Sequence, residues 1–251
     1  MQRSILNYLL ILALVQGAAA MLLGIRPGPP ARGWIFLLCA LPWTALTGWI
    51  SMRNAHLLYT IEGSRVSRLN LATRVTLLRV IAVPLLVVLI LAREFPAAGF
   101  VFLGMALTDW LDGFLARRMG EVTQLGRIAD PAIDALFCGV TCLALALVGL
   151  LPLWVFLLVL LRYAVLAGGA AGLRLLLGYL PVRATFAGRS FYLVQYGLLA
   201  AMLVMGRHSP WTRIAGSALG AVQVLVSAQL VGLGLSLYRE ARRTAGGAHG
   251  A

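Results

Sequence analysis

Eight strongly apolar stretches follow one another along this chain, and each is about as long as a helix that crosses a bilayer. They cover residues 5–24, 33–52, 71–92, 97–116, 129–150, 152–173, 185–205 and 211–237. A spanning helix needs about 20 mostly apolar residues. Proline- and glycine-containing segments, such as Arg26-Pro27-Gly28 and Ser209-Pro210, separate most of these stretches. The pattern predicts an all-α fold, a polytopic membrane helix bundle.

Composition and charge agree with this interpretation. Of the 251 residues, 61% are hydrophobic and 12% are charged, which excludes an ordinary soluble domain. The net charge of +13 arises from 21 basic residues, all of them arginines. A soluble chain with this charge would suggest nucleic acid binding, but here most arginines cluster at the ends and in alternate connections, as the positive-inside rule requires. We expect an integral protein of a bacterial cytoplasmic membrane, with both termini in the cytoplasm.

The chemistry-bearing residues are concentrated in one short region. All four aspartates, Asp109, Asp112, Asp130 and Asp134, lie within 26 residues, inside or at the edge of apolar stretches. Residues three or four apart share one face of a helix, so two helices joined around residues 118–125 could present two carboxylate pairs to each other. Carboxylates in apolar surroundings require a compensating charge, and all-oxygen ligands suit Mg²⁺ or Mn²⁺. The spacing predicts a divalent-cation site that opens to the cytoplasm.

The residues between the aspartates suggest a phosphorylated ligand. Arg117 stands beside the carboxylates and is suited to contact a phosphate. Gly113, Ala116 and Gly126 are small, which allows a ligand or a neighbouring helix to approach the backbone closely.

The complete string resembles the signature of the CDP-alcohol phosphotransferases, D-x2-D-G-x2-A-R-x8-G-x3-D-x3-D, with all eight fixed positions present. The resemblance extends from about Leu69 to the C-terminal helix. It implies a six-helix family domain over residues 70–251 and the displacement of CMP from a CDP-linked donor by an acceptor hydroxyl. The residues it assigns to the metal are Asp109, Asp112, Asp130 and Asp134, with Asp134 also the catalytic base. It further implies that Gly113, Ala116 and Gly126 shape the cytidine pocket and that Arg117 contacts the nucleotide phosphates.

Two further segments resemble the phosphatidylglycerophosphate synthase branch of this family. Asn70, Thr73, Thr76 and Arg79 are similar to the pattern that opens its membrane domain, and Gly188-Arg189 with Gln195 is similar to a Gly-Lys-Gln feature. The branch usually has lysine where Ala135 stands here, which weakens the acceptor assignment. The implied donor is CDP-diacylglycerol and the favoured acceptor is glycerol 3-phosphate, ahead of inositol phosphate, phosphatidylglycerol or another polar alcohol.

Three arginines lie within apolar stretches and are not explained by topology: Arg79, Arg162 and Arg189. Arginines inside a membrane are functional candidates, and anions are their expected partners. We expect Arg162 and Arg189 to bind an anionic group of the acceptor. The alternative for each arginine is a structural pair with an aspartate or an extended side chain that reaches the interface.

Two additional apolar stretches precede the family domain. We interpret residues 1–54 as a transmembrane two-helix hairpin and residues 55–69 as an interfacial segment. Residues 1–54 contain no acidic residue, so we expect the hairpin to be dispensable for chemistry. The pattern from Gly216 to Gly220, like that from Gly168 to Gly172, indicates close helix packing, including a contact in a homodimer.

Two other function classes compete with the enzyme. A divalent-cation transporter could use the same carboxylates, but it would leave the glycine, alanine and arginine positions without a role, and no second copy of the motif is present. A non-catalytic scaffold would not need four costly aspartates. Cys138 and Cys142 are one helical turn apart, and we interpret them as inert packing residues.

Overall fold

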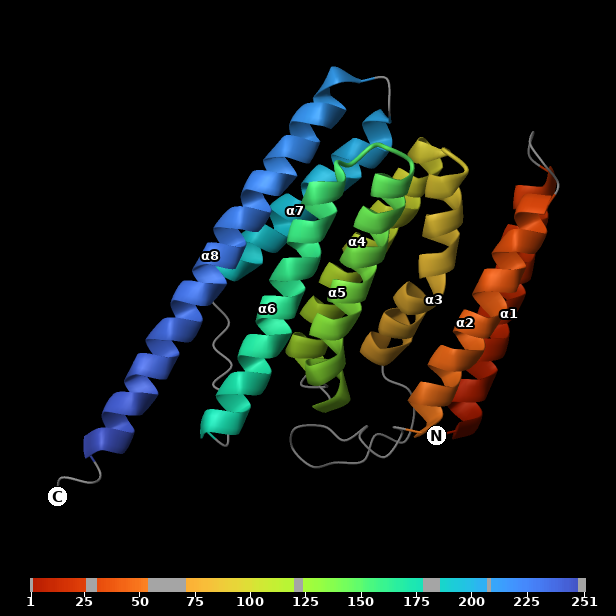
Figure 1. The fold of residues 1–251 in the computed structure, drawn as a ribbon. Helices are drawn as coiled ribbons and strands as arrows, with labels where there is room; N and C mark the ends of the chain where they lie inside the picture. The colour runs from red at the N-terminus through yellow and green to blue at the C-terminus, as the bar shows by residue number, and fades with distance from the viewer. Residues whose placement is uncertain are drawn as a thin grey trace. The chain divides into compact units, whose positions relative to one another are not determined.

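The computed structural model describes residues 2–25, 31–53, 71–119, 124–177, 186–206 and 209–247. All regular secondary structure in these ranges is helical, which confirms the predicted all-α fold (Figure 1). Each predicted apolar stretch corresponds to one helix. The helices are α1 (Gln2–Ile25), α2 (Ala31–Arg53), α3 (Leu71–Leu91), α4 (Phe95–Met119), α5 (Gln124–Leu147), α6 (Leu153–Leu177), α7 (Phe186–Met205) and α8 (Pro210–Gly247).

The apolar surface of the helices is that of a membrane protein. Three helical stretches within the described ranges are long and apolar enough to cross a bilayer: Ile5–Ile25, Arg32–Arg53 and Pro210–Ser236. Shorter apolar stretches occupy α3 to α7. Leu14, Leu38 and Phe100 are 74–76% exposed. Such exposure of large apolar side chains on long helices is expected where lipid, rather than water, covers the surface.

The chain divides into two compact units, Met1–Ala144 and Leu145–Ala251. In the first unit, α1 packs on α2, α2 packs on α3, and α3 packs on α4. Ile5, Leu9 and Leu12 of α1 form a buried cluster with Leu77 and Ile81 of α3. The predicted hairpin therefore packs directly against the first helix of the predicted family domain.

Close contact between α1 and α2 depends on a glycine. A Cβ atom added to Gly33 would lie 2.5 Å from the carbonyl oxygen of Ala20, well inside van der Waals contact. Because the obstacle is backbone, it cannot rotate away as a side chain could.

Tight turns join α3 to α4 and α5 to α6. After α3, Arg93 has a positive φ of 61° and donates its N–H to the Ile90 carbonyl, while Glu94 donates to the Leu89 carbonyl. This is the Schellman arrangement, in which a residue in the left-handed region closes the helix. Gly149 has a φ of 75° and occupies the same position after α5. The first of these turns returns the chain so that α4 packs on α3.

In the second unit, α6 and α7 both pack on α8. Gly216 faces Met202 and Pro152, and a Cβ atom added to Gly220 would lie 2.4 Å from the Trp154 ring. The predicted close packing at Gly216 and Gly220 is thus confirmed between helices of one unit. Gly168 and Gly172 have open space beside them within the described residues, and their role in a homodimer stays a prediction.

Candidate active site at the α4–α5 signature

The eight signature positions are divided between two consecutive helices. Asp109, Asp112, Gly113, Ala116 and Arg117 belong to α4, and Gly126, Asp130 and Asp134 belong to α5. Since α4 ends at Met119 and α5 begins at Gln124, the signature occupies the end of one helix and the start of the next. This confirms the helical context predicted from the spacing. The side chains of all these residues except Asp134 lie outside the described part of the structure, as does the side chain of Arg189 on α7.

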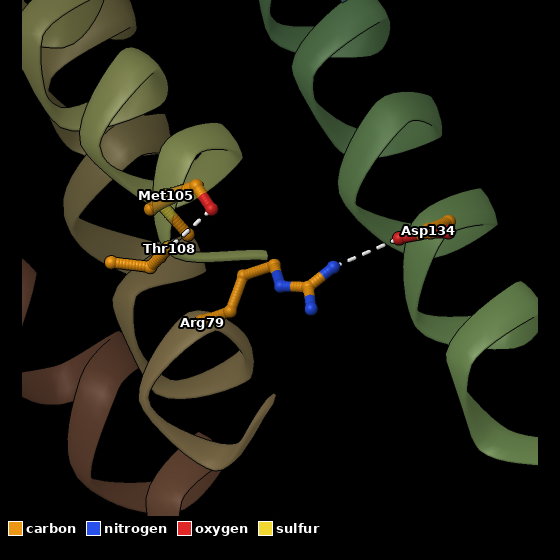
Figure 2. Close-up of polar contacts among 4 residues, drawn as sticks. All are labelled: Arg79, Met105, Thr108 and Asp134. Atoms are coloured by element: carbon orange, nitrogen blue, oxygen red, sulfur yellow. Dashed lines mark hydrogen bonds and ion pairs between the residues drawn. The ribbon is translucent and has the colours of Figure 1, made fainter. Parts of the chain in front are cut away.

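Asp134 forms an ion pair with Arg79 of α3. Arg79 Nη1 donates to Asp134 Oδ1 at 2.9 Å, and Figure 2 shows the arginine side chain extending from α3 towards α5. The Arg79 side chain is 2% exposed and that of Asp134 is 23% exposed. A guanidinium stays protonated in proteins, so it compensates the carboxylate in apolar surroundings. Of the alternatives considered for Arg79, pairing with an aspartate is the one observed.

Helices α4 and α5 are held together next to this ion pair. Phe102 of α4 stacks on Phe137 of α5, with ring centroids 5.1 Å apart and an interplanar angle of 16°. Phe137 lies three residues after Asp134, on the adjoining turn of the same helix. Thr108, directly before Asp109, donates its hydroxyl to the Met105 carbonyl within α4 at 2.9 Å (Figure 2). The ring stack joins α4 to α5 one turn away from Asp134.

Arg162 is the centre of a separate polar cluster in the second unit. It is 2% exposed, and its Nη1 donates to the side-chain oxygens of Gln195 on α7 and Gln223 on α8, the latter at 3.2 Å. Its guanidinium lies over the rings of Tyr163 and Tyr192, 5.2 Å and 4.9 Å from their centroids. No carboxylate pairs with Arg162 in the described ranges, where its Nε also lacks a hydrogen-bond partner. Its charge is therefore met by neutral oxygens and aromatic faces.

Comparison with known proteins explains the signature. The sequence profile described as CDP-alcohol phosphatidyltransferase matches residues 69–229, well over half of the chain. The chain belongs to the CDP-alcohol phosphatidyltransferase family. This confirms the resemblance seen in the signature and the enzyme class that it implied. The matched region contains every signature residue together with Arg79, Arg162 and Arg189, and it begins after α2.

Bacterial relatives of this family member carry two different names. A protein named cardiolipin synthase (CMP-forming) from Streptomyces coelicolor is 35% identical over 57% of this chain and 68% of its own length. Two proteins named CDP-diacylglycerol–glycerol-3-phosphate 3-phosphatidyltransferase also match. The one from Pseudomonas fluorescens is 38% identical over 31% of this chain and 41% of its own length. The one from Bacillus subtilis is 30% identical over 43% and 62%. The chain thus spans less than two thirds of these last two relatives.

The residue types of the signature fit a hard divalent cation. Four carboxylates on adjoining helices offer only oxygen ligands, which Mg²⁺ and Mn²⁺ prefer. Among the described side chains there is no group of three or more potential metal ligands, since Asp134 alone represents the four aspartates there. Asp134 already has a cationic neighbour, because it forms an ion pair with Arg79.

Several polar residues that the sequence analysis did not single out are buried or half-buried at helix contacts. Gln16 and Thr44 join α1 to α2, Trp43 joins α2 to α3, and Gln223 joins α8 to Arg162. The signal that could have found Gln16 and Gln223 is a glutamine amid an apolar stretch. Cys138 and Cys142 are buried and free of disulfide bonds, in agreement with a packing role.

Proposed function

We propose that this chain transfers a phosphatidyl group from CDP-diacylglycerol to the hydroxyl of glycerol 3-phosphate and releases CMP. The observation that carries the proposal is the complete eight-position signature, placed on consecutive helices of a family member. The names of the Pseudomonas and Bacillus relatives support glycerol 3-phosphate as the acceptor. The apolar surface of the helices suits a lipid donor that arrives from within the bilayer.

The reaction forms a bond between the acceptor oxygen and the phosphorus of the phosphatidyl group and breaks the bond from that phosphorus to CMP. Such a transfer requires positioning and charge neutralisation more than covalent help from the protein. Asp109, Asp112, Asp130 and Asp134 would hold Mg²⁺ or Mn²⁺. When bound, the ion would neutralise the diphosphate and stabilise the leaving CMP.

The remaining residues have roles that follow from their chemistry. Asp134 would accept the proton of the acceptor hydroxyl, and the ion pair with Arg79 would orient this carboxylate. Arg117 would neutralise a nucleotide phosphate, and the small residues Gly113, Ala116 and Gly126 would admit the cytidine. We also propose that Arg162 and Arg189 bind the phosphate of the acceptor. This role suits the guanidinium of Arg162, which is buried and has no carboxylate partner in the described residues.

The experiment that tests the proposal measures CMP release by the purified protein in detergent micelles containing CDP-diacylglycerol. With Mg²⁺ and glycerol 3-phosphate we expect CMP and phosphatidylglycerol phosphate, and with EDTA we expect neither. An acceptor panel should include phosphatidylglycerol, because the Streptomyces relative is named a cardiolipin synthase. CMP release with phosphatidylglycerol but not with glycerol 3-phosphate would show that phosphatidylglycerol is the acceptor, and phosphatidyl transfer would still be the reaction. Divalent-cation uptake by proteoliposomes without CMP release would favour a transporter.

A further inference from the structure

Helix α3 contains a proline that leaves one backbone carbonyl without its helical donor. Pro84 lies inside the helix and has no N–H, so the carbonyl of Val80, four residues earlier, cannot form its usual hydrogen bond. In the hydrocarbon region of a membrane no water is present to replace that donor, and an unsatisfied carbonyl is costly there. A proline within a membrane helix is therefore tolerated where neighbouring helices supply donors.

The N-terminal hairpin supplies these donors. The indole Nε1 of Trp43, on α2, donates to the Val80 carbonyl at 2.7 Å. The side-chain Nε2 of Gln16, on α1, donates to the next carbonyl, that of Ile81, at 3.3 Å. Gln16 is 5% exposed and also donates to Thr44 Oγ1 at 2.9 Å, which connects the two hairpin helices at the same level. Each helix of the hairpin thus contributes one donor to the segment before Pro84.

The segment held in this way immediately follows Arg79. Leu77 and Ile81 lie two residues before and two residues after Arg79. Both are buried in the cluster formed with Ile5, Leu9 and Leu12 of α1. Arg79 itself is 3% exposed and reaches away from the hairpin to Asp134. The direction of the Arg79 side chain depends on the rotation of α3 about its own axis. The hairpin contacts and the ion pair therefore restrain the same helical turn from opposite sides.

We propose that the α1–α2 hairpin is a positioning element for the active site, in which Trp43 and Gln16 hold α3 at Pro84 so that Arg79 stays aligned with Asp134. Trp43 is a positioning residue, because it acts on the site through Val80 and Arg79. The effect on turnover rests on the proposed function, in which Asp134 is the base. This inference differs from the expectation that residues 1–54 are dispensable, and the following experiment decides between the two.

The first test replaces Trp43 by phenylalanine, which removes the N–H donor and keeps an aromatic ring. We expect Trp43→Phe to lower kcat for CMP release about tenfold and to change the KM of CDP-diacylglycerol by less than about twofold, since binding groups are untouched. The matched control is Trp34→Phe on the same helix, where the side chain is 71% exposed and kcat should be unchanged. An unchanged kcat in Trp43→Phe, or a change confined to KM, would overturn the proposal.

The second test asks whether Trp43 acts through the carbonyl that Pro84 leaves without a donor. Pro84→Ala restores an N–H that can satisfy Val80, so adding Trp43→Phe to this variant should lower kcat by less than about twofold. The same tenfold loss in both backgrounds would show that Trp43 serves another purpose and would overturn the proposal. Gln16→Met, which removes the donor to Ile81, provides an independent variant if Trp43→Phe does not fold, and its kcat should fall as well.

A third measurement separates this inference from the proposed function. Amide hydrogen exchange in the protein without substrate reports on α3 whether or not CMP is released. We expect Trp43→Phe to accelerate exchange at residues 85–88, directly after the proline, by at least about fivefold relative to Trp34→Phe. If Trp43→Phe accelerates exchange but the native protein never releases CMP, the proposed function is wrong and the docking of the hairpin on α3 is still supported. Unchanged exchange would overturn the docking itself.

Discussion

At the scale of single residues, the structure gives the buried arginines different partners. Arg79 pairs with the carboxylate of Asp134, whereas Arg162 meets two glutamine oxygens and two tyrosine rings. A buried guanidinium opposite a carboxylate is already compensated. A buried guanidinium held only by neutral groups still attracts an anion. We therefore assign Arg79 to the positioning of Asp134 and keep Arg162 as the candidate for the acceptor.

Replacing a signature aspartate should abolish most activity. We expect Asp112→Ala to lower kcat for CMP release at least about a hundredfold, because it removes a charged ligand from the proposed metal site. Glu240→Ala, which removes a carboxylate outside the signature, should leave kcat nearly unchanged. The measurement is steady-state CMP release at saturating Mg²⁺. Near-normal turnover in Asp112→Ala would contradict the metal assignment.

Removing the cation beside Asp134 should also reduce turnover. We expect Arg79→Ala to lower kcat about tenfold or more, since the carboxylate loses the group that orients and compensates it. Arg79→Lys keeps the positive charge and should recover part of the loss, although an ammonium lacks the planar geometry of a guanidinium. The comparison of kcat in these two variants checks the role of the ion pair. Identical kcat in native protein and Arg79→Ala would remove Arg79 from the site.

The acceptor arginines make a different kinetic prediction. Arg162→Ala and Arg189→Ala should each raise the KM of glycerol 3-phosphate about tenfold and that of CDP-diacylglycerol by less than about twofold. Arg213 is exposed on α8 of the same unit, so Arg213→Ala serves as the control for lost positive charge. Initial rates with each substrate varied in turn separate the two constants. Equal increases in both KM values would show that neither arginine distinguishes the acceptor.

At the scale of helices, close approach and hydrogen bonding act together in the hairpin. Gly33 lets α2 approach the backbone of α1, and Gln16 with Thr44 forms a polar contact in the same helix pair. Small residues allow helices in lipid to gain packing contacts that the hydrophobic effect does not provide there. The hairpin is thus a preformed surface on which α3 can dock.

A side chain at Gly33 should separate the hairpin helices. We expect Gly33→Val to lower the unfolding temperature in detergent, because its Cβ would lie 2.5 Å from the Ala20 carbonyl oxygen. Gly17→Ala on α1 is the matched control, since a Cβ there meets no atom within 4 Å and alanine favours helix. Thermal unfolding followed by intrinsic tryptophan fluorescence gives both values. Equal stability of the two variants would show that the close approach does not matter.

At the scale of the whole molecule, the arginine distribution predicts the orientation of the helices. If each helix of the described residues crosses the bilayer once, both ends of the chain lie on one side, together with the α4–α5 connection that follows Arg118 near the end of α4. The positive-inside rule assigns that side to the cytoplasm. Reporter domains fused at each terminus and inserted at residues 118–123 should therefore report a cytoplasmic location. An insertion at Gly149, between α5 and α6, should report the opposite side, and agreement between the two insertions would refute this topology.

The helices, the membrane environment and the family signature could all be predicted from the amino-acid sequence. These features depend on local chemistry: twenty apolar residues specify a spanning helix, and eight identities at fixed spacing specify the family motif. Asp134 could be predicted as the base from its position in the motif alone. Arg79, Arg162 and Arg189 could be recognised as unusual because each is a charge within an apolar stretch.

Which of these groups contact one another depends on how the helices pack. Arg79 and Asp134 are 55 residues apart, Trp43 and Val80 are 37 apart, and Arg162 and Gln223 are 61 apart in sequence. No periodicity within one helix specifies such pairs, because they depend on how each helix is rotated against its neighbours. The docking of the hairpin on α3 could not be predicted from the sequence for a further reason. A backbone carbonyl that lacks its helical donor can be inferred from Pro84, but the side chain that satisfies it is decided by packing.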